Sequence, residues 1–534
     1  MANDIKLLDC TLRDGGYLND WQFGRSNIIN IFERLVSAGI DIIETGFIDE
    51  RREYDRDRTI FPDTAAVNRT YMGLERGRSM IVGMIDYGTC CADRIDPAKD
   101  CFLDGIRIIF KKQKMHEAID FCRLIKEKGY KVFAQAVSIT SYNDEELSEL
   151  IGLVNDLEPY AFSLVDTYGL LHKGTLRHYF DFACCHLKKS IGIGYHAHNN
   201  FQLAYANSIE LLDDPPGDRM LIVDGTLYGM GKSAGNTPIE LLVMHMNSKG
   251  AAYHNSQILE AIEVTMLEMY RKVGWGYSFK FFLAASHDCH PNYVTYLMDT
   301  GKLSVRSINE ILSSLEDEKK LLYDADHIRD LYFDYQKRSC ADSESVSELY
   351  KDLAGADILI LGPGKNIYAQ RDRVERYLEG KNCTLISINF IPEGYDIDYV
   401  FMSNAKRYVG LSSALCEQKK RSKLIATSNI TRTSGEFDYT LNYGDLLDEE
   451  ALMPDNPLIM LLKILKRSGA SSIGLAGFDG YRQTSVSNYV NPNMEYSYSS
   501  KEADNINRDT VRGIRKAGLA KPPVFVTESI YETL

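Results

Sequence analysis

The sequence has no apolar run that approaches the ~18 residues of a membrane span. Its richest apolar stretch, Leu458–Leu465, is short and interrupted by Lys463, so we expect a buried helix there. The start, MANDIKLLDCTLRDGG, lacks a basic segment followed by an apolar one, so we expect no signal peptide. No C-x-x-C occurs among the 11 cysteines, which is typical of reduced cysteines in a cytoplasmic protein.

An excess of basic residues is also missing. Lys and Arg total 61 against 75 Asp and Glu, which gives a formal net charge of −14. A general nucleic-acid binder needs clustered cations, so we expect no nucleic-acid partner, although a local basic pocket for an anionic substrate remains compatible with this charge. The 534 residues are too many for one hydrophobic core. We expect several domains of roughly 100–200 residues, or about 250 for a barrel.

The first 230 residues repeat a short apolar run followed by an amphipathic helical stretch. This alternation predicts a parallel sheet covered by helices, and eight such units favour a closed (β/α)8 TIM barrel. A doubly wound open sheet is the alternative. It requires a Gly-rich phosphate turn after the first strand, and the segment Arg13–Gly16 matches that poorly. The expected strands are Ile5–Leu12, Ile40–Glu44, Ser79–Ile85, Gly105–Phe110, Lys131–Val137, Ala161–Val165, Gly192–His196 and Leu221–Asp224.

The rest of the chain changes period twice. We expect a helical extension packed on the barrel, and then a Rossmann-like α/β domain that starts near Ala356. The Asn-, Ser- and Tyr-rich tail Ser485–Asn507 predicts a loop. The expected domains are residues 1–255, 256–350 and 351–534. The expected helices are Ile258–Val273, Ser307–Leu315, Asp326–Tyr335 and Gln370–Leu378, and the later strands are Asp357–Leu361, Thr384–Asn389, Tyr399–Met402, Lys423–Ala426 and Ser472–Ala476.

Three polar segments fall at the carboxyl ends of expected barrel strands, the face that carries active sites in such barrels. Arg13 and Asp14 follow the first strand. His196 and His198 stand two residues apart, so both imidazoles point the same way and can reach one ion. Asn236 lies in the Gly-rich loop after the eighth strand. Each segment alone also fits an ordinary surface turn or flexible loop.

Together the segments offer carboxylate, imidazole and amide ligands. This set favours Mn²⁺ or Mg²⁺, and Zn²⁺ less.

These residues carry a resemblance to a family. D-x-T-L-R-D-G, H-A-H-N and G-x-G-x-x-A-G-N-T-P-x-E resemble the DRE-TIM metallolyase superfamily, closest to 4-hydroxy-2-oxovalerate aldolase-like proteins, over roughly residues 5–310. The resemblance implies a TIM barrel and a divalent metal held by Asp14, His196 and His198, with Asn236 as a further or water-bridged ligand. It also implies that Arg13 stabilises an enolate oxygen and that other strand-end residues line the pocket: Glu44, Gln135, Asp166 and Thr167.

The implied activity is a metal-dependent aldolase that acts on pyruvate or another 2-oxo acid and an aldehyde. Tyr17 stands where the related aldolases carry His, which puts the usual short substrate in doubt. The acyl-CoA branches are less favoured: the synthases have Gly-Glu-Gln after Arg-Asp, and the CoA lyase has a Cys in the last barrel loop, whereas this chain has neither. A Claisen-type synthase and a non-catalytic barrel that serves as a binding or scaffold module stay open, and we expect a homo-oligomer.

Two further groups of residues have positions from which they could act at the barrel site. Tyr277, His287 and His290 follow it in a segment that resembles the one packed over the aldolase barrel mouth, so we expect them to bind substrate or, alternatively, to cap helices. A Schiff-base mechanism would need a buried lysine at a strand end. Lys111 and Lys112 hold that position, but adjacent lysines more often mark a solvated loop.

The C-terminal domain begins with a strand that runs into Gly362-Pro363-Gly364. Such a turn can present backbone N–H groups to a phosphate. The arrangement resembles nucleotide-handling Rossmann domains, such as those of bacterial sialyltransferases and pterin pyrophosphokinases. We therefore expect a nucleotide or nucleotide-sugar near Gly362 and Gly364, with a role in unusual-sugar or surface-polysaccharide metabolism, or else an assembly domain.

Overall fold

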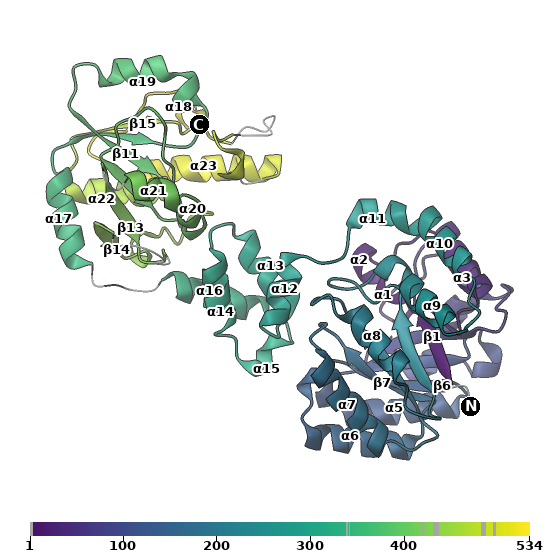
Figure 1. Cartoon of the computed structure of the whole chain (residues 1–534). Helices are drawn as coiled ribbons and strands as arrows, with labels where there is room; N and C mark the ends of the chain where they lie inside the picture. Colours follow the sequence, from purple (N-terminus) through teal and green to yellow (C-terminus); the bar gives the residue numbers. More distant parts are fainter. Residues whose placement is uncertain are drawn as a thin grey trace. The chain divides into compact units, whose positions relative to one another are not determined.

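The computed structural model describes residues 4–337, 340, 342–418, 421–430, 437–481, 488–494 and 498–533. The chain divides into two compact units, one up to Pro291 and one from Asn292 onward (Figure 1). Each unit is treated by itself below. The division into three domains at residues 255 and 350 stays a prediction.

The first unit is a closed parallel barrel, as predicted. Its first strand, β1, pairs with the last barrel strand, β9, on one side and with β2 on the other, so the sheet has no open ends. This closure excludes the doubly wound alternative for the first unit. The barrel strands are β1 Ile5–Asp9, β2 Ile42–Ile48, β4 Met80–Asp86, β5 Gly105–Phe110, β6 Lys131–Ala136, β7 Ala161–Asp166, β8 Gly192–Ala197 and β9 Leu221–Gly225, and the short β3 Ile60–Phe61 pairs beside β2.

The first strand is shorter than predicted. It ends at Asp9 instead of Leu12, and Thr11–Asp14 forms a helical turn, α1. The cause is local: the Asp9 carboxylate accepts hydrogen bonds from the Thr11 N–H and hydroxyl, both at 2.9 Å, which turns the chain out of the strand. The turn carries Arg13 and Asp14 back over the barrel mouth.

Helices cover the outside of the barrel (Figure 1). In α3, for example, Ile28, Ile31, Phe32 and Leu35 recur at helical spacing and are buried. The predicted helix Ile258–Val273 is present, with a π-helical turn at Ile262–Met266. The larger helices of this unit are α3 Arg25–Ala38, α4 Thr64–Tyr71, α5 Met115–Glu127, α6 Asp144–Leu157, α7 Lys173–His186, α8 Ala204–Asp213, α9 Ile239–Ser248, α10 Asn255–Ala261, α11 Leu267–Val273 and α12 Phe279–Ser286.

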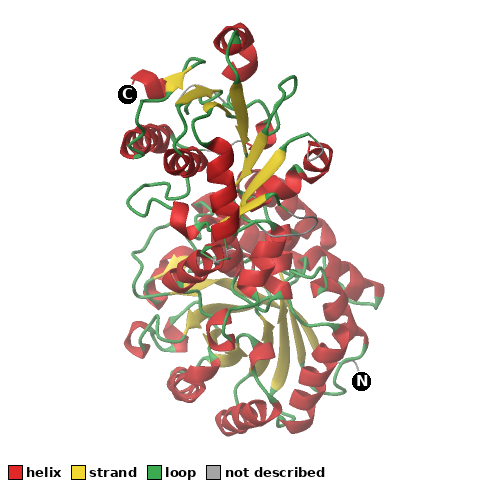
Figure 2. Ribbon diagram, turned by 90° about the vertical axis from the view of Figure 1, so that its left-hand side faces the viewer, coloured by secondary structure: helices red, strands yellow, loops and turns green. Residues whose placement is uncertain are grey.

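The second unit holds the other predicted α/β layer, a wholly parallel sheet in the order β14-β13-β12-β11-β10-β15-β16 (Figure 2). Alternate residues of β10 point to opposite faces: Ile358 and Ile360 join one hydrophobic cluster, and Leu359 and Leu361 join another. Both faces of the sheet are therefore covered. The strands are β10 Asp357–Leu361, β11 Cys383–Ile388, β12 Tyr399–Met402, β13 Lys423–Thr427, β14 Tyr439–Leu441, β15 Ser472–Ala476 and β16 Val524–Phe525.

Helices precede and surround this sheet. The predicted buried helix at Leu458–Leu465 is confirmed within α22, where Lys463 reaches out to the carbonyl oxygens of Leu446 and Leu447. The helices are α13 Pro291–Asp299, α14 Val305–Leu312, α15 Asp317–Lys320, α16 Ala325–Gln336, α17 Ser343–Leu353, α18 Asn366–Ala369, α19 Arg371–Leu378, α20 Ala405–Gly410, α21 Ser412–Gln418, α22 Pro457–Ser468, α23 Ser500–Lys516 and α24 Ile530–Thr533.

The prediction of a loop over Ser485–Asn507 is wrong at its end. Residues 500–507 form the first half of α23, which begins with a capping box between Ser499 and Glu502. One narrow face of α23 is buried, including Ala503, Val511 and Ile514. Residues 485–487 and 495–497 of the predicted loop lie outside the described residues. Within the parts of the chain that the structure describes, no helix is long and apolar enough to cross a membrane.

Candidate functional site

The structure brings together Arg13, Asp14, His196 and His198, four of the five residues predicted to lie at the metal and the enolate. Asp14 is fully buried in the turn after β1, and its Oδ2 lies 3.1 Å from Nε2 of His196 and 3.9 Å from Nε2 of His198. Arg13 donates from Nη1 to the same oxygen at 2.7 Å. One carboxylate oxygen is therefore shared by a guanidinium and two imidazoles at the carboxyl end of the barrel.

Both imidazoles are held from behind. Nδ1 of His196 lies 2.9 Å from Oδ2 of Asp224, and Nδ1 of His198 lies 3.1 Å from the carbonyl oxygen of Lys232. A carboxylate and a carbonyl both require a donor, so we assign the proton of each ring to Nδ1. Each Nε2 then faces Asp14: that of His198 presents a lone pair, and that of His196 presents one when a cation replaces the proton it shares with Asp14. This is the orientation in which metal-ligating histidines are fixed by their outer partners.

The charge states also suit a cation. Burial raises the pKa of Asp14, but the Arg13 charge and the neighbouring histidines outweigh it and hold that pKa well below its ordinary value. Burial lowers the pKa of His198 to about 3, so this ring is neutral. Burial also disfavours charge on His196, but its hydrogen bonds to Asp14 and Asp224 raise its pKa.

Asn236 and Cys10 complete the floor of this cluster. Among the described residues Oδ1 of Asn236 is buried and has no hydrogen-bond partner, and such an oxygen fits a ligand of a hard cation. Cys10 was not predicted; its Sγ groups with Asp14 and His196, with the ligand atoms within 4.8 Å of one another. Burial raises the pKa of the Cys10 thiol well above its usual value, and Sγ donates to the Gly225 carbonyl at 3.4 Å. We therefore expect the thiol to stay protonated.

Arg13 is itself held by a buried ionic network. Glu44 Oε2 accepts from Arg13 Nε at 2.7 Å and lies 3.1 Å from Nη1 of Arg107. Arg107, on β5, also pairs with Asp224 behind His196. Arg107 and Asp224 were not predicted as site residues. The one available signal was a charged residue in the middle of the aliphatic strand Gly105–Phe110, since a barrel interior tolerates such a charge only when it is paired.

The remaining strand-end predictions lie nearby, in supporting contacts. Gln135 Oε1 accepts from Arg107 Nη2 at 3.2 Å, and its Nε2 donates to Ser163 Oγ at 3.1 Å. Asp166 accepts the N–H groups of the loop that follows β7, at 2.8 and 3.1 Å, and burial raises its pKa to about 6. Thr167 Oγ1 accepts the N–H of Ser138 at 2.7 Å.

Tyr17 lies at the barrel mouth with Lys232, a residue that was not predicted. Lys232 Nζ is 5.4 Å from the ring centre of Tyr17 and 5.9 Å from that of Tyr168. Although Tyr17 is 41% exposed, desolvation of its phenol, partly opposed by Arg13, raises its pKa. The hydroxyl can therefore donate a proton but is a poor base. Burial lowers the pKa of Lys232.

The segment after the barrel contributes unequally. His290 approaches the mouth: its ring centre is 6.3 Å from that of Tyr168, and burial together with the positive Lys232 and Lys111 lowers its pKa to about 4. His287 is the C-cap residue of α12, directly after Ser286. Tyr277 is 57% exposed, and no hydrogen bond or ion pair found among the described residues joins it to the Asp14 cluster.

The lysines of a Schiff-base mechanism lack the required burial. Lys111 is exposed, and Lys112 Nζ forms an ion pair with Glu146 at 2.9 Å. In the second unit, Gly362 and Gly364 each donate their N–H within the fold, to the carbonyl oxygens of Ala476 and Gly477, both at 2.8 Å.

The chain is similar to known proteins and to one protein family. The family model HMGL-like matches residues 4–267. An oxaloacetate decarboxylase of Mycobacterium tuberculosis is 27% identical over 288 residues, 52% of this chain and 81% of that protein. A 4-hydroxy-2-oxovalerate aldolase of Geobacillus genomosp. 3 is 25% identical over 272 residues, 48% of this chain and 76% of that protein.

A solved structure is similar as well: the N-terminal domain of a putative aldolase from Bacteroides vulgatus, with 24% identity and a TM-score of 0.48, over 57% of this chain and 99% of that one. Enzymes named as aldolases and synthases thus match about half of this chain. Residues 4–267 are an HMGL-like domain of the DRE-TIM metallolyase superfamily.

Proposed function

We propose that the barrel is a divalent-metal-dependent carbon–carbon lyase, an aldolase that acts through the enolate of pyruvate or another 2-oxo acid. One observation carries the proposal: His196 and His198 are each fixed through Nδ1, and both direct Nε2 at the ionised Asp14. The ligands are Asp14, His196 and His198, with Asn236 Oδ1 as a fourth. Oxygen and imidazole ligands favour Mn²⁺ or Mg²⁺.

When bound, such an ion supplies Lewis-acid polarisation of the 2-oxo group. Arg13 adds a fixed positive charge where the enolate oxygen develops. The guanidinium suits this task because Glu44 and Asp14 hold it in one orientation, and a pre-oriented charge needs no rearrangement during the reaction. Glu44 is thus a positioning residue in this proposal.

The barrel mouth favours an anionic substrate. The ammonium group of Lys232 lies 5.4 Å from the ring centre of Tyr17 and 5.9 Å from that of Tyr168, and the backbone N–H of Lys232 donates to Asp14 Oδ1 at 3.0 Å. We infer that it attracts the carboxylate of the 2-oxo acid, and that Tyr17 donates a proton to the oxygen of the aldehyde partner. Lys232 acts in its charged form and Tyr17 in its protonated form, so neither group acts as a base in these roles.

Two related reactions pass through the same enolate. Aldol cleavage releases it with an aldehyde, and decarboxylation of a 2-oxo diacid releases it with carbon dioxide. The similarity to proteins named 4-hydroxy-2-oxovalerate aldolase and oxaloacetate decarboxylase supports a chemistry that contains this shared step. A Claisen-type synthase is the second candidate, since a probable 2-isopropylmalate synthase of Methanosarcina mazei is 25% identical over 276 residues.

The test is exchange of the methyl protons of pyruvate in deuterated water, followed by NMR, with metal content measured in parallel. We expect exchange that requires Mn²⁺ or Mg²⁺ and is lost in Arg13→Ala but kept in Arg123→Ala, a change at a residue on the outer helix α5. If the protein binds no metal and does not exchange the protons of any 2-oxo acid, the barrel is non-catalytic. Release of carbon dioxide from oxaloacetate distinguishes decarboxylation from aldol cleavage.

A further inference from the structure

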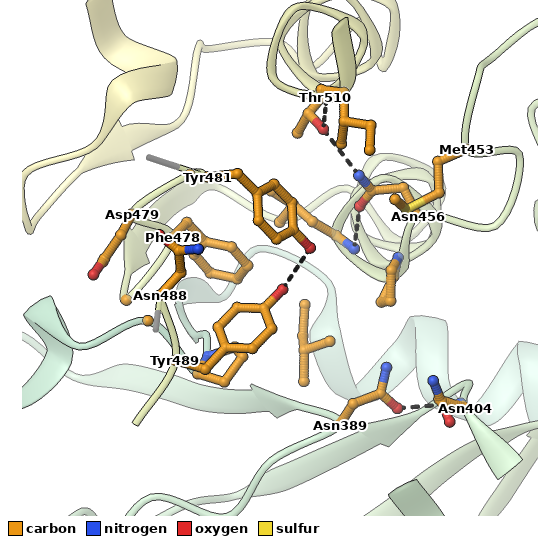
Figure 3. Close-up of a pocket in the computed structure, with 18 of the residues that line it drawn as sticks. Asn389, Asn404, Met453, Asn456, Phe478, Asp479, Tyr481, Asn488, Tyr489 and Thr510 are labelled. Carbon is orange, nitrogen blue, oxygen red and sulfur yellow. Dashed lines mark hydrogen bonds between the residues drawn. The ribbon is translucent and has the colours of Figure 1, made fainter. Parts of the chain in front are cut away.

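A cavity lies at the carboxyl edge of the second sheet, where the strand order reverses between β10 and β15 (Figure 3). It encloses about 950 Å³, counted with the open solvent at its mouth. In open parallel sheets ligands bind in the crevice at this switch point. Four strand ends contribute to the lining: Pro363 and Gly364 after β10, Asn389 after β11, Ser403 and Asn404 after β12, and Gly477–Tyr481 after β15.

The turn after β10 is not built to cradle a phosphate. Gly364 N–H donates to Gly477, and Asn366 N–H donates to the Asp479 carboxylate at 2.9 Å, so these donors are used inside the fold. The glycines instead allow two loops to touch: a Cβ on Gly362 would lie 2.6 Å from the Gly477 carbonyl oxygen. Gly362 and Gly364 therefore serve close packing of the loops.

Among the described residues that line the cavity, positive charge is not in surplus. Its two cations, Lys302 and Arg407, are matched in number by two carboxylates, Asp455 and Asp479. Lys302 pairs with Asp455, and Arg407 donates to the Met494 carbonyl at 2.8 Å. Polyanion recognition relies on cations that are available to the ligand. The lining thus favours a ligand that is recognised through its uncharged part.

One wall is aromatic. The hydroxyls of Tyr481 and Tyr489 lie 2.7 Å apart and hold the two rings together, with centres 6.1 Å apart. Tyr498 packs edge-on against Tyr481 at 5.1 Å, and Phe478 lies beside them (Figure 3). Such rings offer faces and edges to a flat aromatic group, and stacking of a base on an aromatic side chain is worth about 1–3 kcal/mol.

The opposite wall consists of oriented amides. Asn389 Oδ1 accepts the Ser403 N–H at 2.9 Å, and Asn456 donates from Nδ2 to Thr510 Oγ1 at 3.2 Å (Figure 3). Asn404 stands next to Asn389 on the same wall. Nδ2 of Asn389 also donates to Ser403 Oγ at 3.2 Å, and Oδ1 of Asn456 also accepts the Leu458 N–H at 3.0 Å, so both amides are fixed through both of their groups. Each Nδ2 still has a second N–H, which can donate to a hydroxyl of a ligand.

We propose that this cavity binds a nucleoside, with its base against the tyrosine wall and its ribose hydroxyls at the asparagine wall. The ligand is either the free nucleoside or the nucleoside part of a larger molecule. A monosaccharide would leave the aromatic wall without a flat partner, and a phosphate alone would match neither wall. The site is separate from the barrel chemistry proposed above.

The experiment is calorimetric titration of the full chain with adenosine, guanosine, cytidine, uridine and their 5′-monophosphates. We expect at least one base to bind with one site per chain. Its 5′-phosphate should change the Kd by less than about tenfold, because the cations of the described lining are matched by carboxylates. Binding of monosaccharides but not nucleosides, or no binding at millimolar concentration, overturns the proposal.

Two adjacent substitutions locate the site. Met453→Trp fills the cavity and should weaken binding by at least about tenfold, whereas Leu452→Trp adds the same ring at a side chain that is 68% exposed and absent from the lining. Unchanged binding in Met453→Trp would refute the site. If that variant fails to fold, photolabelling of the unmodified chain with an azido-nucleoside decides: label on peptides spanning residues 453–498 supports the proposal, and label confined to the barrel refutes it. Pyruvate exchange by Met453→Trp should equal that of the unmodified chain.

Discussion

Arg107 and Arg13 share one carboxylate oxygen, Oε2 of Glu44, at 3.1 and 2.7 Å. The three side chains come from β5, the turn after β1, and β2, and all are buried. Glu44 thereby links the guanidinium beside Asp14 to a second guanidinium that faces Asp224. The position of the Arg13 charge beside the proposed metal therefore depends on Glu44, which is not one of the proposed ligands.

The first prediction concerns Arg107. Arg107→Met leaves Glu44 and Asp224 buried beside one cation fewer, so the barrel should lose about 3–5 kcal/mol of stability, as when one partner of a buried ion pair is removed. Thermal unfolding followed by circular dichroism measures this. Arg123→Met, which removes an ion pair with Asp120 on the surface, should change stability by less than about 1 kcal/mol. Equal effects of the two changes would contradict the network.

The second prediction concerns the partner of His196. Asp224→Asn removes the charge that orients the ring, and loss of such a partner typically costs 10–100-fold in metal affinity. Titration with Mn²⁺ measures the change. Asp213→Asn is the matched control, because Asp213 contacts His245 at the same short range but on the surface. If both variants bind Mn²⁺ like the unmodified chain, His196 is not oriented for a metal.

The third prediction concerns ion-dependent stability. Mn²⁺ at about 100 times its Kd should stabilise the barrel by about 2.7 kcal/mol, because it binds only the folded state. The melting temperature should rise on addition of the ion and fall with a chelator. In His198→Ala the rise should be much smaller. A melting temperature that ignores Mn²⁺ in the unmodified chain would count against the proposed ligands.

The fourth prediction concerns pH. Burial raises the pKa of Asp9 to about 7, against an ordinary value of 3.8. The protonated form is therefore favoured in the folded state, and the stability that Asp9 contributes below about pH 4 is lost as pH rises to about 7. Asp9→Asn keeps an oxygen for the Thr11 N–H but cannot ionise. The variant should gain stability relative to the unmodified chain between pH 4 and 8; a difference that does not vary with pH would show that Asp9 titrates normally.

The barrel and the core of its site could be predicted because their signals are local. Continuous apolar runs such as residues 80–85 indicate buried parallel strands, and residues at strand ends meet at one face. Asp14, His196 and His198 therefore came together as expected. Arg107 could not be predicted as a site residue, because its partners Glu44 and Asp224 lie on β2 and β9 and the sequence of β5 does not indicate them.

The second unit shows the same division. Five of the seven strands described in its sheet were predicted from their apolar runs, whereas the short edge strands β14 and β16 were not. The first half of α23 was predicted to be a loop, because its polar composition hides a narrow buried face. The sequence places part of the cavity lining, Asn389, Asn404 and Gly477 to Gly480, near strand ends where a ligand could bind. The other lining residues are scattered between Lys302 and Tyr531, and only the fold assembles them.

Ring closure through β1 has a consequence for biosynthesis. The strand before Asp14, β1, can pair with β9 only after residue 221 has been made, and Asp224 and Asn236 are made later still. A nascent chain that stops short of this point cannot assemble the ligand set. Capture of the proposed ion should therefore require that the complete barrel has emerged from the ribosome, and fragments that end earlier should be unable to compete for the ion.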